Sequence, residues 1–141
     1  MFKNLEINPS LAFTAGCLGA LANSLTVWFF GVASITGLLG VGIAPALTPA
    51  WLYPRIVWGG LWGFLFMAPV MKGKSIHLKG ALFSIFPTLI QLLVVFPLKA
   101  KKGVLGLDIG LATPVFVIVF NLVWGLVAAE WIRRSNSGAQ A

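Results

Sequence analysis

The chain has 141 residues, of which 59% are hydrophobic and only 9% are charged. Soluble domains average about one quarter charged residues, so this composition excludes a water-soluble fold and indicates an all-α protein that spans a membrane. Lys and Arg exceed Asp and Glu by ten to three, but the basic residues flank apolar runs as membrane anchors do, which argues against a nucleic-acid partner.

Four apolar runs follow one another along the chain. Each has about the 20 residues that a helix needs to cross ~30 Å of hydrocarbon. The first extends over about residues 11–31, and Asn8 and Pro9 before it are typical of a helix start. The other runs extend over about residues 53–71, 80–98 and 109–131. We therefore expect four transmembrane helices in a single membrane domain, followed by a disordered tail at residues 135–141.

The connection between the first two runs is rich in Gly and Pro and yet strongly apolar. It contains GLLGVGIAPALTP at residues 37–49, where the prolines prevent one continuous helix. We expect a short half-helix at residues 34–39 and then an extended turn at the membrane interface, where Trp51 and Tyr53 are typical residues. A re-entrant loop over residues 34–50 is the alternative, provided that protein shields its backbone from lipid.

The remaining two connections, at residues 72–79 and 99–108, are short and basic. Four crossings would place both termini on one side of the membrane. The basic residues then divide into Lys3, Lys72, Lys74, Lys79, Arg133 and Arg134 on the terminal side and Arg55, Lys99, Lys101 and Lys102 on the other. This small excess favours cytoplasmic termini in a bacterial inner membrane or an equivalent membrane.

The apolar connection has a near copy in the second half of the chain, GVLGLDIGLATP at residues 103–114. A shift of 66 residues aligns the two copies, and it also aligns VWG at residues 57–59 with VWG at residues 123–125. A shift of 64 residues places Gly16 on Gly80 and Ser24 on Thr88. This half-chain period predicts two tandem helical hairpins, over about residues 10–71 and 80–134, related by an axis along the membrane normal. Chance similarity between low-complexity membrane segments is the alternative.

Residues 79–130 also resemble a known kind of protein. The features are the opening KG, FPL at the end of the third run, GVLGL, and NLVWG in the fourth run. These features resemble the second half of small, glycine-rich, four-helix bacterial membrane proteins of the YagU-like kind. The resemblance implies a helical membrane fold without established catalytic residues, so it assigns no role to any single residue.

Small residues recur every four positions on the predicted helices. Gly59 and Gly63 form a GxxxG motif, and Gly16, Gly19 and Gly125 belong to similar patterns. Such residues allow membrane helices to approach closely. We therefore expect these five glycines at helix–helix contacts.

Three amide side chains are predicted to lie at one depth, near the middle of the hydrocarbon core: Asn23, Gln91 and Asn121. Ser84 and Thr88 share a helix face with Gln91, at a spacing of i, i+4 and i+7. These five residues form a candidate midplane polar site, which either holds the helices together or lines a path for a ligand or an ion. The absence of a carboxylate at that depth argues against a proton-coupled pump.

The charged residues suggest two ion pairs. Glu130 precedes Arg133 and Arg134 by three and four residues, the spacing of a local pair on a helix surface. Arg55 and Asp108 each follow one copy of the repeated connection, so they are expected on the same side of the membrane and could pair across the duplication. The alternative is that Asp108 caps the fourth helix.

No pattern of reactive residues predicts an enzyme. His77 is the only histidine and Cys17 the only cysteine, and neither has a partner at metal-ligand or nucleophile–base spacing. The glycine-rich stretches lack the strand that a phosphate-binding loop requires. We therefore expect no catalytic residue, no metal and no cofactor.

Two functions fit these features. The first is an accessory, assembly or scaffold subunit of a membrane complex, which acts through helix–helix contacts made by its small-residue faces. The alternative is a small oligomeric transporter or channel whose path is lined by the midplane polar site. Besides the lipid bilayer, the expected partners are further copies of the chain or the subunits of a larger membrane complex.

Overall fold

The computed structural model describes residues 5–71 and 73–139, and within them every regular element is a helix. The elements are α1 (Pro9–Val32), α2 (Ile35–Leu38), α3 (Pro49–Gly63), η1 (Phe64–Met67), α4 (Ile76–Phe83), α5 (Ile85–Ile90), η2 (Gln91–Lys99), η3 (Val104–Gly106) and α6 (Thr113–Ala139). Three stretches are long and apolar enough to cross a membrane, namely Pro9–Val32, Ile76–Lys99 and Thr113–Ser137. These stretches confirm the prediction of a helical membrane protein.

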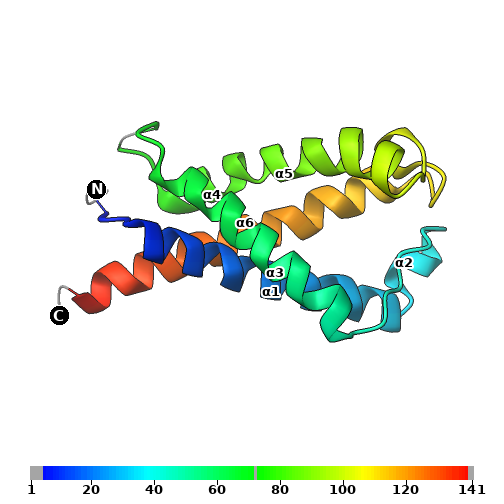
Figure 1. The fold of residues 1–141 in the computed structure, drawn as a ribbon, viewed down its shortest axis with the longest axis horizontal. Coiled ribbons are helices and arrows are strands. Elements are labelled where there is room, and N and C mark those ends of the chain that lie inside the picture. Colours follow the sequence, from blue (N-terminus) through cyan, green and yellow to red (C-terminus); the bar gives the residue numbers. More distant parts are fainter. Residues whose placement is uncertain (1–4, 72, 140–141) are drawn as a thin grey trace.

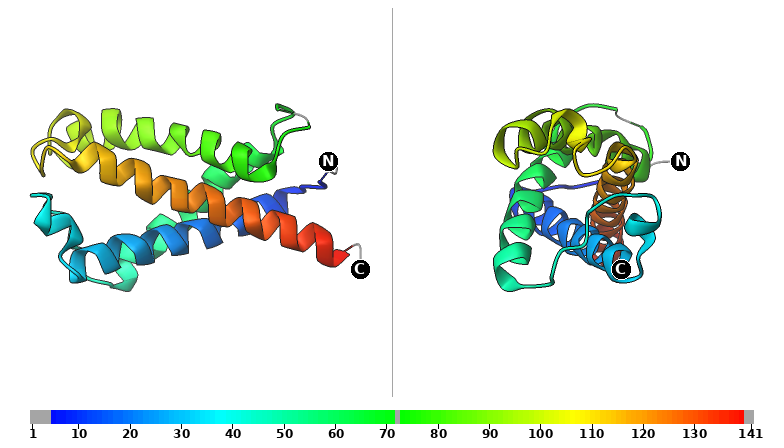
Figure 2. Two further views of the ribbon diagram at one scale, coloured as in Figure 1. Left: turned by 180° about the vertical axis from the view of Figure 1, so that it is seen from behind. Right: turned by 90° about the vertical axis from the view of Figure 1, so that its right-hand side faces the viewer.

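The helices run between two ends of an elongated bundle (Figure 1). Both ends of the chain lie at one end of the bundle, together with residues 68–71 and 73–75, and we call it the terminal end. The segments that contain α2 and η3 lie at the other end, which we call the connector end. Viewed from the connector end, α1 packs against α3 and α6, and α6 packs in turn against α4 (Figure 2).

The first residues of two helices show how the local sequence determines where a helix begins. Asn8 accepts a hydrogen bond from the backbone N–H of Leu11 at 2.7 Å, with Pro9 in the first turn of α1. Thr48 accepts one from the N–H of Trp51 at 3.2 Å, with a proline again in the first turn. A side-chain acceptor followed by proline satisfies an unpaired helix donor and presets the backbone, so α1 and α3 begin at these points.

Several predicted boundaries are wrong. The last helix begins at Thr113 rather than near residue 109, and it continues through residues 135–139, which were expected to be disordered. The extension has a partner, because the side-chain amide of Asn136 donates to the Glu6 carbonyl at 3.2 Å and accepts from the Glu6 N–H at 2.9 Å. Residues 140–141, Lys3 and Lys72 lie outside the described residues.

The third predicted helix also begins earlier than expected, at Ile76. Ser75 caps it by accepting from the backbone N–H of His77 at 3.2 Å. Further along, the helix widens into the π-helical turns of η2 around Pro97. Proline has no N–H to donate, and the next bonds run from the N–H of Ala100 to the Val95 carbonyl and from the N–H of Lys102 to the Phe96 carbonyl, both at 2.7 Å.

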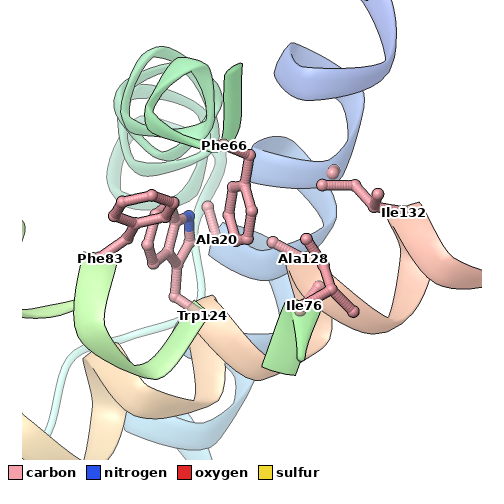
Figure 3. Close-up of a cluster of buried hydrophobic side chains, with 9 residues drawn as sticks. Ala20, Phe66, Ile76, Phe83, Trp124, Ala128 and Ile132 are labelled. Atoms are coloured by element: carbon pink, nitrogen blue, oxygen red, sulfur yellow. The ribbon is translucent and has the colours of Figure 1, made fainter. Parts of the chain in front are cut away.

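A hydrophobic core at the terminal end joins all the long helices (Figure 3). The rings of Phe66 and Phe83 meet edge to face with centroids 5.3 Å apart. Trp124 lies beside them and is 3% exposed, and its indole N–H donates to the carbonyls of Gly16 and Gly59, each at 3.2 Å. This core therefore ties α1, α3, α4 and α6 together at one end of the bundle.

The five glycines expected at helix contacts lie where helix backbones meet. A Cβ on Gly16 would overlap the backbone of Gly59 and Gly63, a Cβ on Gly19 would overlap Trp124, and a Cβ on Gly125 would overlap Gly80. Glycine at these positions is what permits the close crossings of α1 with α3 and α6 and of α4 with α6.

Candidate functional site: a polar network beside a cavity

Three of the predicted midplane residues form a hydrogen-bonded network inside the bundle. The amide of Asn121 on α6 donates to the Thr88 hydroxyl on α5 at 3.0 Å. The amide of Asn23 on α1 donates to the Phe120 carbonyl at 2.7 Å and lies 3.3 Å from the Asn121 side-chain oxygen. Asn23, Thr88 and Asn121 are all buried, so these bonds join three helices in a region that water reaches poorly.

The other two predicted members of the site have different surroundings. The Ser84 hydroxyl donates to the Ala81 carbonyl of its own helix at 2.6 Å, and the Ser84 carbonyl accepts from the Thr88 hydroxyl at 2.7 Å. Ser84 therefore supports Thr88 without reaching another helix. Gln91 is half-buried and lines a cavity beside the network.

Arg55 is the residue of this site that sequence reasoning missed. Its Nε donates to the Ser24 hydroxyl at 2.9 Å, and its Nη2 donates to the Asn23 side-chain oxygen at 2.6 Å. The guanidinium carbon lies 4.6 Å from the centroid of the Trp51 ring, within the range of a cation–π contact. Arg55 thus extends the network from α1 to α3.

The sequence carried a signal for this placement. Arg55, Gly59 and Gly63 are spaced by four residues, so they lie on one face of α3. The two glycines pack against α1, and therefore the same face directs Arg55 toward Asn23 and Ser24.

The predicted pair between Arg55 and Asp108 is wrong, and Asp108 does not cap α6. Arg55 is held by neutral acceptors on α1. Asp108 is exposed and folds back on its own connector, where its N–H donates to the Lys102 carbonyl at 3.0 Å. The helix begins five residues later, at Thr113, and the connector before it packs on the first connector, where Gly110 lies against the backbone of Gly40 and Val41.

A cavity of about 330 Å³ lies next to the network. Its polar wall includes Asn23, Arg55 and Gln91, and its apolar wall includes Val27, Trp51, Ile43, Phe96, Val117 and Phe120. The extended connector at residues 42–45 also lines it. The cavity therefore combines one cationic side chain and two amides with aromatic and aliphatic side chains, and polar and apolar atoms contribute about equally to its surface.

A second polar cluster lies at the terminal end. Glu130 accepts from Arg133 Nε at 2.9 Å and from Arg134 Nε at 2.7 Å, which is the local arrangement that the spacing suggests. His77 on α4 is an additional partner, with its Nε2 2.8 Å from Glu130 Oε2. The cluster is largely exposed, so it contributes little to stability and forms no enclosed site.

Among the described residues, no group of three His, Cys, Asp or Glu side chains could hold a metal ion. Comparisons with protein-family models, with curated proteins and with solved structures found no match. The resemblance to YagU-like proteins therefore stays a prediction.

Proposed function

We propose that the protein crosses the membrane four times, as two tandem helical hairpins, with both termini on one side. The three apolar stretches supply three crossings, and the fourth is α3 continued by η1. These two elements follow each other without a break over residues 49–67 and run from the connector end to the terminal end (Figure 1). Nineteen helical residues are about enough to cross the hydrocarbon core.

Equivalent contacts in the two halves support the duplication. The shifts of 64 and 66 residues carry Gly16 and Gly59 onto Gly80 and Gly125, and each pair forms a close helix crossing. The same shifts carry Ser24 and Arg55 onto Thr88 and Asn121, and each pair is joined by a hydrogen bond, at 2.9 and 3.0 Å. The recurrence of both a packing contact and a polar contact supports duplication over chance similarity of apolar segments.

The connectors add a third equivalence. Gly40 and Gly106, which the shift of 66 residues aligns, have φ angles of +72° and +69°. This left-handed backbone favours glycine. The two connectors also meet, since the N–H of Gly42 donates to the Ile109 carbonyl at 3.1 Å.

We propose further that the protein is a small transporter or channel whose solute site is the cavity beside the polar network. The observation that carries this proposal is that Asn23, Arg55 and Gln91, from α1, α3 and η2, reach one cavity of about 330 Å³. In a membrane protein, buried polar and ionisable groups that face an internal cavity mark solute pathways. Discontinuous helices at such sites are also typical of transporters, and both the connector at residues 42–45 and the π-helical η2 border this cavity.

One of the three supports for the role as an accessory subunit is weakened. That prediction was based on small-residue faces, on the lack of reactive groups and on the small size of the parts outside the membrane. The glycines of these faces are used inside the chain, where Gly16, Gly19, Gly59, Gly63 and Gly125 contact other helices of the same molecule. We therefore place the transporter or channel first.

Water access to the cavity tests the proposal without knowledge of the solute. In a Cys17→Ser background, a Gln91→Cys variant in lipid nanodiscs should react with water-soluble, membrane-impermeant thiol reagents. Two control variants should resist, because Leu93 on the same helix is 52% exposed on the outer surface, where lipid would cover it, and Ala128 is fully buried. An unreactive Gln91→Cys thiol would rule out a solute site in this cavity.

A further inference from the structure

Arg55 carries a positive charge that no acidic side chain balances. The chain has three acidic residues. Glu130 and Glu6 belong to the terminal end, where Glu130 binds Arg133 and Arg134, and Asp108 is exposed in the connector. Within residues 5–71 and 73–139, the contacts of Arg55 are with a hydroxyl, an amide oxygen and an aromatic ring. The cavity wall therefore has a net positive charge.

The neighbours of Arg55 hold the guanidinium in place without neutralising it. Ser24 and Asn23 accept from Nε and Nη2, and Trp51 lies over the guanidinium plane. A guanidinium has five N–H donors in a planar fork, and the bonds to Ser24 and Asn23 use two of them. The remaining donors are available to a ligand in the cavity, of which Arg55 forms part of the wall.

A fixed charge in a poorly hydrated site attracts a counter-ion strongly. Arg55 is half-buried; partial burial of a cation without an acidic partner has a free-energy cost, and an anion in the cavity would offset that cost with charge-assisted hydrogen bonds. The amide of Gln91 lines the same wall and can supply neutral donors, whereas the side-chain N–H groups of Asn23 face Phe120 and Asn121 within the network. The polar part of the cavity is therefore suited to an anionic group.

The apolar lining of the cavity indicates what the uncharged part of the ligand is like. Trp51, Phe96 and Phe120 are aromatic, and Val27 and Val117 are aliphatic. Such a surface favours an apolar ligand body over a fully hydrated inorganic ion. Outside the cavity, the exposed residues Lys99, Lys101 and Lys102 at the connector end would raise the local concentration of anions.

We infer that the cavity binds a small organic anion, whose charged group is held by Arg55 and whose apolar body packs among Trp51, Phe96 and Phe120. This inference rests on the proposed function, since it names the class of solute for the same cavity. Such an anion can come from the aqueous phase or from the headgroup of an anionic lipid. Both have the same recognition chemistry, and the experiment below separates the two sources.

The charge preference can be measured at the Gln91→Cys thiol in the Cys17→Ser background. Two methanethiosulfonate reagents of similar size are compared, one with an anionic sulfonatoethyl group and one with a cationic trimethylammonioethyl group. Their rates are normalised to those with a free thiol in solution, in nanodiscs of phosphatidylcholine. We expect the anionic reagent to react about tenfold faster or more, because a fixed charge in a low-dielectric cleft concentrates its counter-ion.

Three further variants assign the preference to Arg55. Arg55→Gln should bring the ratio of normalised rates close to one. Arg55→Lys keeps the positive charge and should keep most of the preference for the anionic reagent. Lys101→Gln is the matched control, because it removes one positive charge from the same end of the bundle but from an exposed residue. This variant should keep most of the preference for the anionic reagent. A structural role of Arg55 alone would affect both reagents equally.

Competition with an added ligand tests the anion preference in a protein that keeps Arg55. Benzenesulfonate should slow the modification of Gln91→Cys, while its neutral analogue benzenesulfonamide should not. If phosphatidylglycerol in the nanodisc removes both the rate ratio and the protection, an anionic lipid is the natural source of the bound group. If it does not, the source is aqueous.

The outcomes also separate this inference from the proposed function. Equal normalised rates for both reagents, with equal protection by the sulfonate and the sulfonamide, would overturn the anion preference and leave a solute cavity. Failure of both reagents to react would overturn both proposals. If Arg55→Gln does not fold, the comparison of benzenesulfonate with benzenesulfonamide still decides the question.

Discussion

At the scale of single residues, each polar group of the network is satisfied by a side chain or carbonyl from another helix. Asn23 is the central member, because it donates to the Phe120 carbonyl and accepts from Arg55. Asn121 joins α6 to α5 through Thr88. Since the removal of one partner leaves another buried group unpaired, single changes here should cost more than the net value of one hydrogen bond.

Replacement of Asn121 by alanine tests this point. The change leaves the Thr88 hydroxyl without its donor, and we expect the free energy of unfolding to fall by about 1–2 kcal/mol. Thr26→Ala is the control, because the Thr26 hydroxyl bonds only to the Ala22 carbonyl of its own helix. Unfolding by SDS in mixed micelles measures the free energy of unfolding of both variants. Equal effects of the two variants would contradict a cross-helix role for Asn121.

The glycine crossings give a second prediction at this scale. A Cβ on Gly125 would overlap the Gly80 carbonyl, whereas a Cβ on Gly37 would meet nothing within 4 Å. We expect Gly125→Ala to lower the free energy of unfolding by about 1–3 kcal/mol, because α4 and α6 must separate. Gly37→Ala should be close to neutral in the same assay. A tolerated alanine at residue 125 would mean that the two helices do not cross so closely.

At the scale of elements, the connectors and the irregular helix η2 determine the shape of the cavity. The helix widens around Pro97, where the bond from Ala100 reaches back five residues to Val95. This irregular turn carries Phe96, which lines the cavity. On the opposite wall, α3 begins at its Thr48 cap, and its first two turns carry Trp51 and Arg55. The start of α3 therefore sets the position of the cation.

The cap of α3 can be tested directly. Thr48→Ala removes the acceptor for the N–H of Trp51, and we expect a loss of about 1 kcal/mol in the free energy of unfolding. Thr48→Ser keeps a hydroxyl and should restore most of it. The same SDS titration measures the series. If the alanine and serine variants are equally stable, the hydroxyl does not cap α3.

At the scale of the whole molecule, hydrophobic clusters join the two halves at both ends of the bundle, and the cavity lies beside the cluster at the connector end. Trp124 and the aromatic core tie the long helices together at the terminal end (Figure 3). Toward the connector end, Val27, Val41, Phe116 and Phe120 form a second cluster beside the polar network and the cavity.

The number of crossings can be established by labelling from one side of the membrane. In the Cys17→Ser background, Gly37→Cys lies in the first connector and Lys74→Cys in the loop at the terminal end; both positions are exposed. If α3 and η1 cross the bilayer, an impermeant maleimide should label these two thiols from opposite sides of oriented vesicles. Labelling from the same side would show that only the three longer stretches cross.

The assembly state distinguishes the two functional classes. We expect native mass spectrometry of the protein, extracted gently from its own membranes, to show a homo-oligomer, because a chain this small needs further copies to enclose a path. A stoichiometric foreign subunit would return the accessory role to first place. A monomer would contradict the channel form of the proposal.

The sequence by itself determined the helical membrane class and the approximate positions of the three long apolar helices, and it predicts a common depth for the amides. Apolar runs, cap residues and residue spacing are local properties, and they predict which residues share a helix and a depth. Only the tertiary structure decided that Asn121 reaches Thr88, that Gln91 faces a cavity, and that Arg55 turns to Asn23 rather than to Asp108. These pairings depend on how α1, α3, α5 and α6 cross, and the crossings are set by glycines on separate helices whose contacts no single helix contains.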